Sequence, residues 1–318
     1  MAAAQDSSKP AHLEPSKLGT REYWDSLYIR EQSNHETNPS DKGTVWFDDS
    51  NAETKVVRFL RARVADEPVP ITSGDSANAT NPDADADADA DAESDSEDSE
   101  DDDNESPRKD LSYRSSSFLD LGCGNGSLLF ALRRAGFAGP RLGIDYSSAS
   151  IAFARQIVAS ASEADESLAF AEWDVLKGSY ADVLGSGSSN GDAAATDATP
   201  LPPCFASTAN GFDVVLDKGT FDAISLSSET GATGGRVCED YARRVLRLVR
   251  RGGILVITSC NWTEDELVSW FQKAGQGERA QGDEGLGSWV LDGRVNYRVF
   301  SFGGVTGQTI STLCFRRV

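Results

Sequence analysis

The sequence of 318 residues has few of the side chains on which many enzymes depend. It contains only two histidines, His12 and His35, and both lie outside the segments predicted to form a sheet. A Ser-His-Asp hydrolase is therefore disfavoured. Its five cysteines are widely scattered without a C-x-x-C pair, so we expect reduced thiols and neither a disulfide framework nor a metal site.

Long apolar segments are also missing. No run approaches 18 apolar residues, and the first residues, MAAAQDSSKPAH, contain no apolar core of a signal peptide. We therefore expect no membrane span and a cytoplasmic location, with the nucleus as the alternative.

Basic residues are not clustered, apart from those in 243–251. The net charge is −21, but Asp83 to Glu105 contains fourteen acidic residues and no basic one, so the remaining residues carry −7. A mildly acidic chain without a basic footprint is not expected to bind nucleic acid directly. The acidic stretch lacks the glycine and glutamate positions of a calcium-binding EF-hand loop, and is predicted to be a solvated insertion.

These patterns predict one folded domain. Residues 1–17 are expected to be loosely structured, and residues 18–318 to form a single domain. Two low-complexity insertions interrupt it, the acidic one at about 66–108 and one rich in Gly, Ser, Ala and Pro at 185–211. The second insertion contains a formal G-x-S-x-G match at 187–191, but no apolar strand precedes it, so it does not indicate a hydrolase.

The most informative stretch is SSFLDLGCGNGS, residues 116–127. An apolar run ending in Asp120 and followed by Gly122, Gly124 and Gly126 predicts a buried strand that turns sharply into a helix. Glycine permits positive φ and close approach of a ligand to the main chain, and the helix directs free N–H groups to the same place. This stretch therefore predicts a nucleotide-like ligand.

Strands and helices alternate after this stretch, which predicts a doubly wound α/β fold. Apolar runs 142–145, 168–173, 212–216 and 254–258 are predicted strands, and 148–161 and 237–250 predicted helices. The last two β-rich runs, 295–302 and 308–316, flank a Gly-rich turn and predict an antiparallel pair. Before the sheet, an aromatic helix at 18–34 either packs on the core or covers a ligand, and a second helix is expected at 52–64.

Ligands of such sheets bind at the carboxyl ends of the strands, where Asp120, Asp145, Asp174 and Asp217 are predicted to lie. The spacing G-x-G-x-G differs from the dinucleotide motif G-x-G-x-x-G, and no phosphate-binding G-x-x-x-x-G-K-[ST] occurs. Acidic residues around the glycines favour a cationic cofactor such as S-adenosylmethionine. Asp145 is placed to accept hydrogen bonds from ribose hydroxyls and Asp174 from an adenine amine, although each could instead cap a helix or turn.

Several motifs carry a family resemblance. FLDLGCGNG, LGIDYS, the strand end Trp173–Asp174 and FDVVLDKGTFDAI resemble the seven-strand S-adenosylmethionine-dependent methyltransferases. SKLGTREYWDSLY, VWFDDS, LDKGTFDAISL, ITSCNWTEDEL and FGGVTGQTI are similar to the protein-lysine methyltransferases that act on translation elongation factor 1-alpha. These motifs span Ser16 to Ile310 and are interrupted by the two insertions.

The resemblance implies a Rossmann-like methyltransferase with an N-terminal helical extension and a C-terminal antiparallel hairpin. It implies S-adenosylmethionine as the cofactor, elongation factor 1-alpha as the protein substrate, and a monomer. The implied cofactor-binding residues are Asp120, Gly122, Gly124, Gly126, Asp145, Tyr146, Asp174, Val175 and Trp46, and no metal is expected.

Asp217 is the candidate catalytic residue, expected to orient the target amine, although it could instead bond to its own turn. Trp46, Phe47, Trp262 and Tyr297 are candidates for a wall around the lysine stem by cation–π contact, with core packing as the alternative. Lys218 is interpreted as an exposed turn residue.

Three other functions share parts of this sequence pattern. A methyltransferase acting on another protein, a small molecule or a nucleic acid keeps the cofactor, but the N-P-P-[YF] motif of nucleic-acid amine methyltransferases is absent after the fourth strand. An NAD-dependent oxidoreductase conflicts with the glycine spacing and with Asp120. A non-catalytic binding module is disfavoured because every expected cofactor position is filled.

Overall fold

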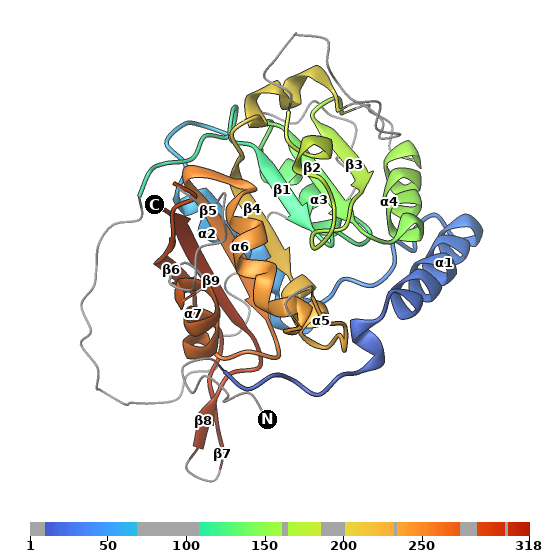
Figure 1. The fold of residues 1–318 in the computed structure, drawn as a ribbon. Helices are drawn as coiled ribbons and strands as arrows, with labels where there is room; N and C mark the ends of the chain where they lie inside the picture. The colour runs from blue at the N-terminus through green and yellow to red at the C-terminus, as the bar shows by residue number, and fades with distance from the viewer. Residues whose placement is uncertain are drawn as a thin grey trace, which may run out of the picture.

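The computed structural model describes residues 10–68, 108–160, 165–185, 201–231, 234–273, 285–302 and 305–318. Its centre is a seven-stranded sheet with the order β3-β2-β1-β4-β5-β9-β6. The strands are β1 (Phe118–Leu121), β2 (Arg141–Asp145), β3 (Leu168–Glu172), β4 (Phe212–Lys218), β5 (Val249–Ser259), β6 (Trp289–Val295) and β9 (Ser311–Arg317). β1 to β5 are parallel, and β9 runs antiparallel to both β5 and β6 (Figure 1). The predicted doubly wound, mainly parallel sheet is confirmed.

Alternating strand residues give the sheet two apolar faces. Val215 packs in one cluster with residues of α5 (Thr220–Ser225), α6 (Tyr241–Leu246) and α7 (Glu264–Lys273). Val214 and Leu216 pack in another with residues of α2 (Ala52–Ala62), α3 (Ser127–Arg134) and α4 (Ser148–Ser160). Both faces are therefore covered by helices, as a buried parallel sheet requires.

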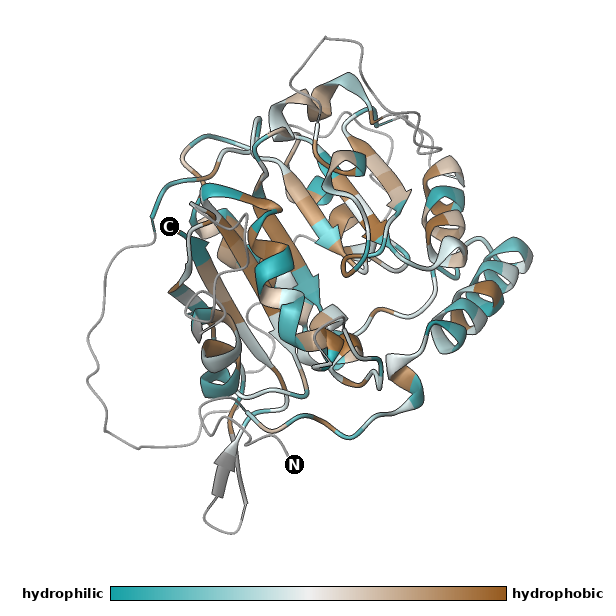
Figure 2. Cartoon of the chain, in the orientation of Figure 1, coloured by the Kyte–Doolittle hydropathy of each residue, from teal (hydrophilic) through white to brown (hydrophobic). Residues whose placement is uncertain are grey.

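The parallel strands all end at the same edge of the sheet. β1 and β4 are hydrophobic along most of their length and hydrophilic at their carboxyl ends (Figure 2). Side chains that follow several strands therefore meet at this edge, which the crossover order of a doubly wound sheet leaves open to a ligand.

The N-terminal helix α1 (Arg21–Thr37) lies beside α4 rather than over a sheet face (Figure 1). Tyr28 of α1 packs with Phe153 and Ile157 of α4. Short 3₁₀ helices precede α1 (Lys17–Gly19) and α2 (Asp48–Ser50), and others occur at Tyr180–Asp182, Pro203–Thr208 and Val237–Asp240. None of the helices in the described segments has the length and apolar character that a bilayer crossing requires.

The antiparallel pairing predicted near the C-terminus is confirmed, but the predicted position of the first strand is wrong. Besides β5, β9 pairs antiparallel with β6, Trp289–Val295, and not with a strand at 295–302. Residues within the predicted strand form β7 (Phe300–Phe302), which pairs with β8 (Val305–Gly307) in a separate two-stranded sheet. Residues 305–307 of the predicted glycine-rich turn therefore form a strand of this small hairpin.

Two other predicted boundaries were wrong. The helix expected at 237–250 is a 3₁₀ turn followed by the short α6, and β5 begins at Val249, so Gly252 and Gly253 lie inside a strand. Gly252 has φ +76°, and the β4–β5 register shifts nearby. The predicted loop 185–211 ends in the 3₁₀ helix Pro203–Thr208, because Phe205 is buried in the core.

The insertions otherwise lie mostly outside the described residues, as do the acidic stretch and the 187–191 motif. The first insertion is narrower than predicted, because its flanks belong to the fold. Val64 forms a parallel bridge with Leu111, and the Asp66 carboxylate accepts hydrogen bonds from the Tyr113 amide (2.7 Å) and the Ser112 hydroxyl (2.8 Å). The chain therefore leaves and re-enters the domain at neighbouring points.

Candidate functional site

A cavity of about 280 Å³ opens at the carboxyl edge of the sheet. It extends from the glycine loop and the ends of β2 and β3 to the ends of β4 and β5, and residues before and within α1 close it on another side. Predicted cofactor residues that line it are Gly122, Gly124, Asp145, Tyr146, Asp174, Val175 and Trp46. The structure thus brings most of the predicted site together.

The glycine loop requires glycine for two reasons. Gly122 and Gly124 have φ values of +60° and +54°, which side chains rarely adopt. A Cβ at Gly122 would lie 2.3 Å from Thr220 Oγ1, and one at Gly124 would lie 2.5 Å from the Tyr28 hydroxyl. The bare main chain therefore allows α1 and α5 to approach the loop closely.

Asp145 ends β2 and is 5% exposed. Its Oδ1 accepts from the Ser147 amide (2.9 Å), and its Oδ2 accepts from the Gly124 amide (3.2 Å) and the Ser150 hydroxyl (2.9 Å). Burial raises the pKa of Asp145, although these three donors pull it down. A carboxylate fixed in this way has one lone pair left for a ligand hydroxyl.

Asp174 and Tyr146 line the same end of the cavity. Asp174 follows β3 and accepts hydrogen bonds from the amides of Leu176 (2.8 Å) and Lys177 (3.2 Å), so it also shapes its own turn. The Arg21 guanidinium lies 5.4 Å from the centre of the Tyr146 ring and forms an ion pair with Glu172 (3.0 Å). Arg21 thereby ties α1 to the end of β3.

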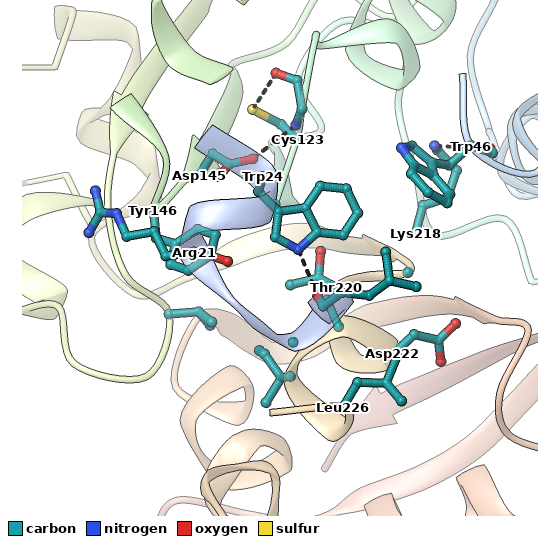
Figure 3. Close-up of a pocket in the computed structure, with 18 of the residues that line it drawn as sticks. Arg21, Trp24, Trp46, Cys123, Asp145, Tyr146, Lys218, Thr220, Asp222 and Leu226 are labelled. Carbon is teal, nitrogen blue, oxygen red and sulfur yellow. Dashed lines mark hydrogen bonds between the residues drawn. The ribbon is translucent and has the colours of Figure 1, made fainter. Parts of the chain in front are cut away.

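Helix α1 both packs on α4 and lines the cavity, so each of the two interpretations of this aromatic helix holds in part. Trp24 and Tyr28 line the cavity, and the Trp24 indole donates to the Leu18 carbonyl at 2.8 Å (Figure 3). The sequence pattern left this open because the aromatics that pack on α4 and those that face the ligand share one helix.

Lys218, interpreted from sequence as an exposed turn residue, is largely buried; its side chain is 12% exposed. Its Nζ donates to the Trp46 carbonyl at 3.2 Å (Figure 3). The same nitrogen lies 3.5 Å from Glu53 Oε1. Ser127 also donates to this Glu53 oxygen. Lys218 therefore fixes the Trp46 loop and α2 against the end of β4.

Asp120 and Gly126 do not line the cavity, contrary to prediction. Burial, with the charges of Glu53, Asp217 and Asp145, raises the pKa of Asp120 to about 8, and Lys218 opposes the shift. Gly126 precedes α3, and a Cβ there would meet the Phe170 ring at 2.7 Å. Both residues therefore lie in or beside the glycine loop without lining the cavity.

Asp217, the predicted catalytic residue, is also outside the cavity lining. It is 1% exposed, and its carboxylate accepts from the amides of Thr220 (2.8 Å) and Phe221 (3.1 Å) and from the Tyr241 hydroxyl (2.5 Å). Burial raises the pKa of Asp217 to about 7. The predicted direct contact with a target amine is not supported, because the carboxylate caps α5, is almost fully buried and does not line the cavity.

At the ends of β4 and β5, which we call the acceptor end, the cavity is lined by residues that the sequence reasoning missed. They include Asp222, Cys260 and Asn261. Cys260 and Asn261 directly follow β5, so the strand-end rule could have found them. Asp222 lies in the first turn of α5 and follows no strand, and no comparable signal marked it.

Of the four candidate wall aromatics, Trp46 and Phe47 line the cavity. Trp262 and Tyr297 are core residues: the Trp262 indole donates to the Ser225 hydroxyl (3.2 Å), and the Tyr297 hydroxyl pairs with that of Thr312 (2.8 Å). Phe47 has φ +64°, a strained value for a bulky residue, and its ring lies against Gly219.

The lining fits an adenosine cofactor with a cationic sulfur. The glycine loop leaves the main chain bare, Asp145 retains acceptor capacity, and aromatic side chains cover the cavity. No group of three or more His, Cys, Asp or Glu side chains among the described residues is arranged to hold a metal ion.

Comparisons with known proteins agree with this geometry. A methyltransferase-domain family model matches residues 113–293. The protein-lysine N-methyltransferase EFM4 of Saccharomyces cerevisiae is 32% identical over 308 residues, covering 96% of this chain and 96% of that protein. The EEF1A lysine methyltransferase 2 of Danio rerio is 27% identical over 310 residues, covering 98% and 92%.

Among solved structures, a magnesium protoporphyrin IX methyltransferase from Synechocystis with bound SAM is 16% identical, with a TM-score of 0.38. The match covers 65% of this chain and 72% of that one.

Proposed function

The chain belongs to the methyltransferase-domain family and, within it, to the protein-lysine N-methyltransferases related to EFM4, and from this premise we propose that it methylates a lysine of translation elongation factor 1-alpha with S-adenosylmethionine. The nearly full-length similarity to proteins named EEF1A lysine methyltransferase 2 supports this substrate. The alternative is another protein or a small molecule with the same cofactor.

The observation that carries the proposal is the single cavity that joins the glycine loop to the ends of β4 and β5. Gly122, Gly124, Asp145, Tyr146 and Asp174 would hold the nucleoside part of the cofactor. The β4–β5 end, with its carboxylate and aromatic side chains, would receive the lysine side chain.

When bound, the cofactor supplies an electrophilic methyl group on a positively charged sulfur. The residues of this chain fix the geometry of an in-line displacement, which accounts for much of the barrier reduction in such reactions. The β4–β5 end of the cavity would hold the target lysine nitrogen, once it has released one proton to solvent water, in line for this transfer.

The protein also limits the water in the cavity. Trp24 and Tyr28 of α1 cover one side, and Trp46 and Phe47 another. A lysine has an ordinary pKa near 10.4, and a partly dry, apolar channel lowers it. Deprotonation therefore needs no histidine, in agreement with the absence of one from the cavity lining.

We also propose that the protein acts in the cytosol. None of the five cysteines forms a disulfide bond in the structure, which is typical of proteins in reducing compartments.

The test is methylation of a cytosolic lysate and of purified elongation factor 1-alpha with labelled cofactor, followed by mapping of the modified residue. We expect label on a lysine of the elongation factor. Label on a different protein would show that this protein, and not elongation factor 1-alpha, is the substrate. Label on a small molecule would contradict protein-lysine methylation. A Gly122→Val variant, which blocks the glycine loop, is the negative control.

A further inference from the structure

We propose that Asp222 is the residue that accepts the hydrogen bond of the target lysine amine and orients it toward the methyl group. This rests on the proposed function, because it assigns a role at the acceptor end of the same cavity.

The position of Asp222 is the first argument. It lines the cavity together with Cys260 and Asn261 from the end of β5, whereas Asp217 does not. In the view of Figure 3, Asp222 lies on the same side of Trp24 as Lys218 and Trp46, and opposite to Arg21 and Tyr146. Asp222 is therefore at the end of the cavity opposite to the residues that would hold the nucleoside.

The hydrogen bonds of Asp222 fix its orientation and leave it able to accept another. Oδ1 accepts from the Ser259 hydroxyl (2.5 Å), and Oδ2 accepts from the Cys260 amide (2.8 Å). Each carboxylate oxygen can accept about two hydrogen bonds. Ser259, the last residue of β5, and the Cys260 amide directly after it therefore hold the carboxylate in place. The Cys260 thiol and the Asn261 amide also bond to it and lower its pKa, so the amine N–H would take a lone pair that these donors leave.

The charge environment of Asp222 is the third argument. It is 5% exposed and has no cationic partner among the described side chains, whereas Asp110, Asp165 and Asp292, which lie elsewhere, each pair with arginine. Lys218, the lysine at the same end, is already bonded to Glu53 and the Trp46 carbonyl. A buried carboxylate without a counter-ion that faces a cavity favours a ligand with positive charge.

Burial raises the pKa of Asp222, and its bonds to Ser259 and Cys260 oppose the shift. An arriving ammonium group would stabilise the ionised carboxylate. After the amine has lost a proton, a hydrogen bond from the remaining N–H to Asp222 leaves the nitrogen lone pair free to point at the methyl carbon.

The experiment uses the intact protein saturated with S-adenosylhomocysteine and two small probes, n-butylammonium and n-butanol. The first carries the four-carbon stem and charge of lysine, and the second is its neutral analogue. Binding is followed by the NMR signal of the Trp46 indole N–H, which has no hydrogen-bond partner in the structure. We expect the wild-type protein to bind n-butylammonium at least tenfold more tightly than n-butanol.

Two variants separate a contact with the amine from a purely structural role. Asp222→Asn should reduce the preference to less than threefold, with the dissociation constant of S-adenosylhomocysteine changed by less than about twofold. Ser259→Ala removes a donor that holds the carboxylate but keeps its charge, and should retain most of the preference. Asp265→Asn removes an exposed acid of α7 outside the cavity lining and is the matched control for charge.

An unchanged preference in Asp222→Asn would overturn the proposal, and so would the absence of any preference in the wild-type protein, which needs no variant to fold. Equal losses in Ser259→Ala and Asp222→Asn would assign Asp222 to structure alone. The proposed function can fail separately from this inference. If the protein prefers n-butylammonium through Asp222 but labels no protein lysine, the role of Asp222 stands and the proposed substrate is wrong.

Discussion

Asp145 is the side chain on which the nucleoside end of the cavity depends most directly. It lies at the end of β2, and three donors fix its carboxylate. The same carboxylate accepts from the Gly124 amide, so it joins the glycine loop to the neighbouring strand. Its loss would affect both the ligand contact and the loop.

Asp145→Ala is expected to weaken cofactor binding by about 10- to 100-fold, since a hydrogen bond to a charged group contributes about 1.5–3 kcal/mol. Isothermal titration with S-adenosylhomocysteine measures this. Glu166→Gln, which removes an exposed acid outside the cavity lining, should bind normally. An unchanged dissociation constant in Asp145→Ala would rule out the ribose contact.

Asp120 predicts a pH dependence of stability. Its pKa is about 8 in the folded protein and near 3.8 in the unfolded chain, so the folded state holds the proton more tightly. As the pH rises from about 4 to about 8, the unfolded chain loses this proton while the folded protein still holds it. The free energy of unfolding therefore falls over this pH range.

Asp120→Asn should therefore raise the melting temperature at pH 8.5 relative to wild type by more than at pH 5. One pKa unit corresponds to about 1.4 kcal/mol, and each kcal/mol changes the melting temperature by about 2–4 °C in a domain of this size, so we expect the two differences to be at least about 3 °C apart. Differential scanning calorimetry at both pH values tests it. Equal differences would show that Asp120 is not protonated in the fold.

At the scale of elements, α1 and the glycine loop form one unit. A Cβ at Gly124 would collide with the Tyr28 hydroxyl at 2.5 Å, while the next ring atom is 3.3 Å away. The helix therefore covers the cavity closely only while residue 124 has no side chain.

Gly124→Ala is expected to weaken cofactor binding by tenfold or more, because α1 must move and φ +54° is strained for alanine. Adding Tyr28→Phe removes the colliding oxygen and should recover part of the loss. The dissociation constants of the two single variants and the double variant measure this coupling. If the double variant only adds the two separate losses, the contact between helix and loop is not responsible.

Sequence patterns were sufficient where one local signal decides the structure. The glycine loop and the strand ends at Asp145 and Asp174 were found this way. They were insufficient where contacts between distant residues decide. Gly252 and Gly253 indicate a stop, but pairing with β4 and β9 draws residues from Val249 onward into β5.

The same limit explains the candidate site. Asp217 follows the strand-end rule, yet Tyr241, 24 residues later in the chain, bonds to its carboxylate and helps to seal it from the cavity. Asp222 lines the cavity, where the Ser259 hydroxyl at the end of β5 and the Cys260 amide bond to its carboxylate. Neither arrangement is visible in local spacing.

At the scale of the whole molecule, the residues on either side of the acidic insertion contact one another. Its flanks are held together by the Val64–Leu111 bridge, by Asp66, and by the ion pair of Arg63 with Asp110 (3.0 Å). These contacts do not require residues 69–107.

Replacing residues 69–107 by a short Gly-Ser linker should leave the melting temperature within about 3 °C and cofactor affinity within about twofold. Loop-closure entropy changes only with the logarithm of loop length, so a shorter loop should if anything stabilise slightly. Thermal unfolding and titration of the shortened protein test this. A large loss of stability would mean that the insertion contacts the domain.

The position of β9 between β5 and β6 has a consequence for the order of folding. β6 precedes β9 in the chain but joins the sheet only through it. During synthesis, Trp289 and the rest of β6 must therefore wait, without a partner in the main sheet, until the ribosome has released β9. The parallel half that carries the glycine loop is under no such delay, so the cofactor site can begin to assemble before the sheet is complete.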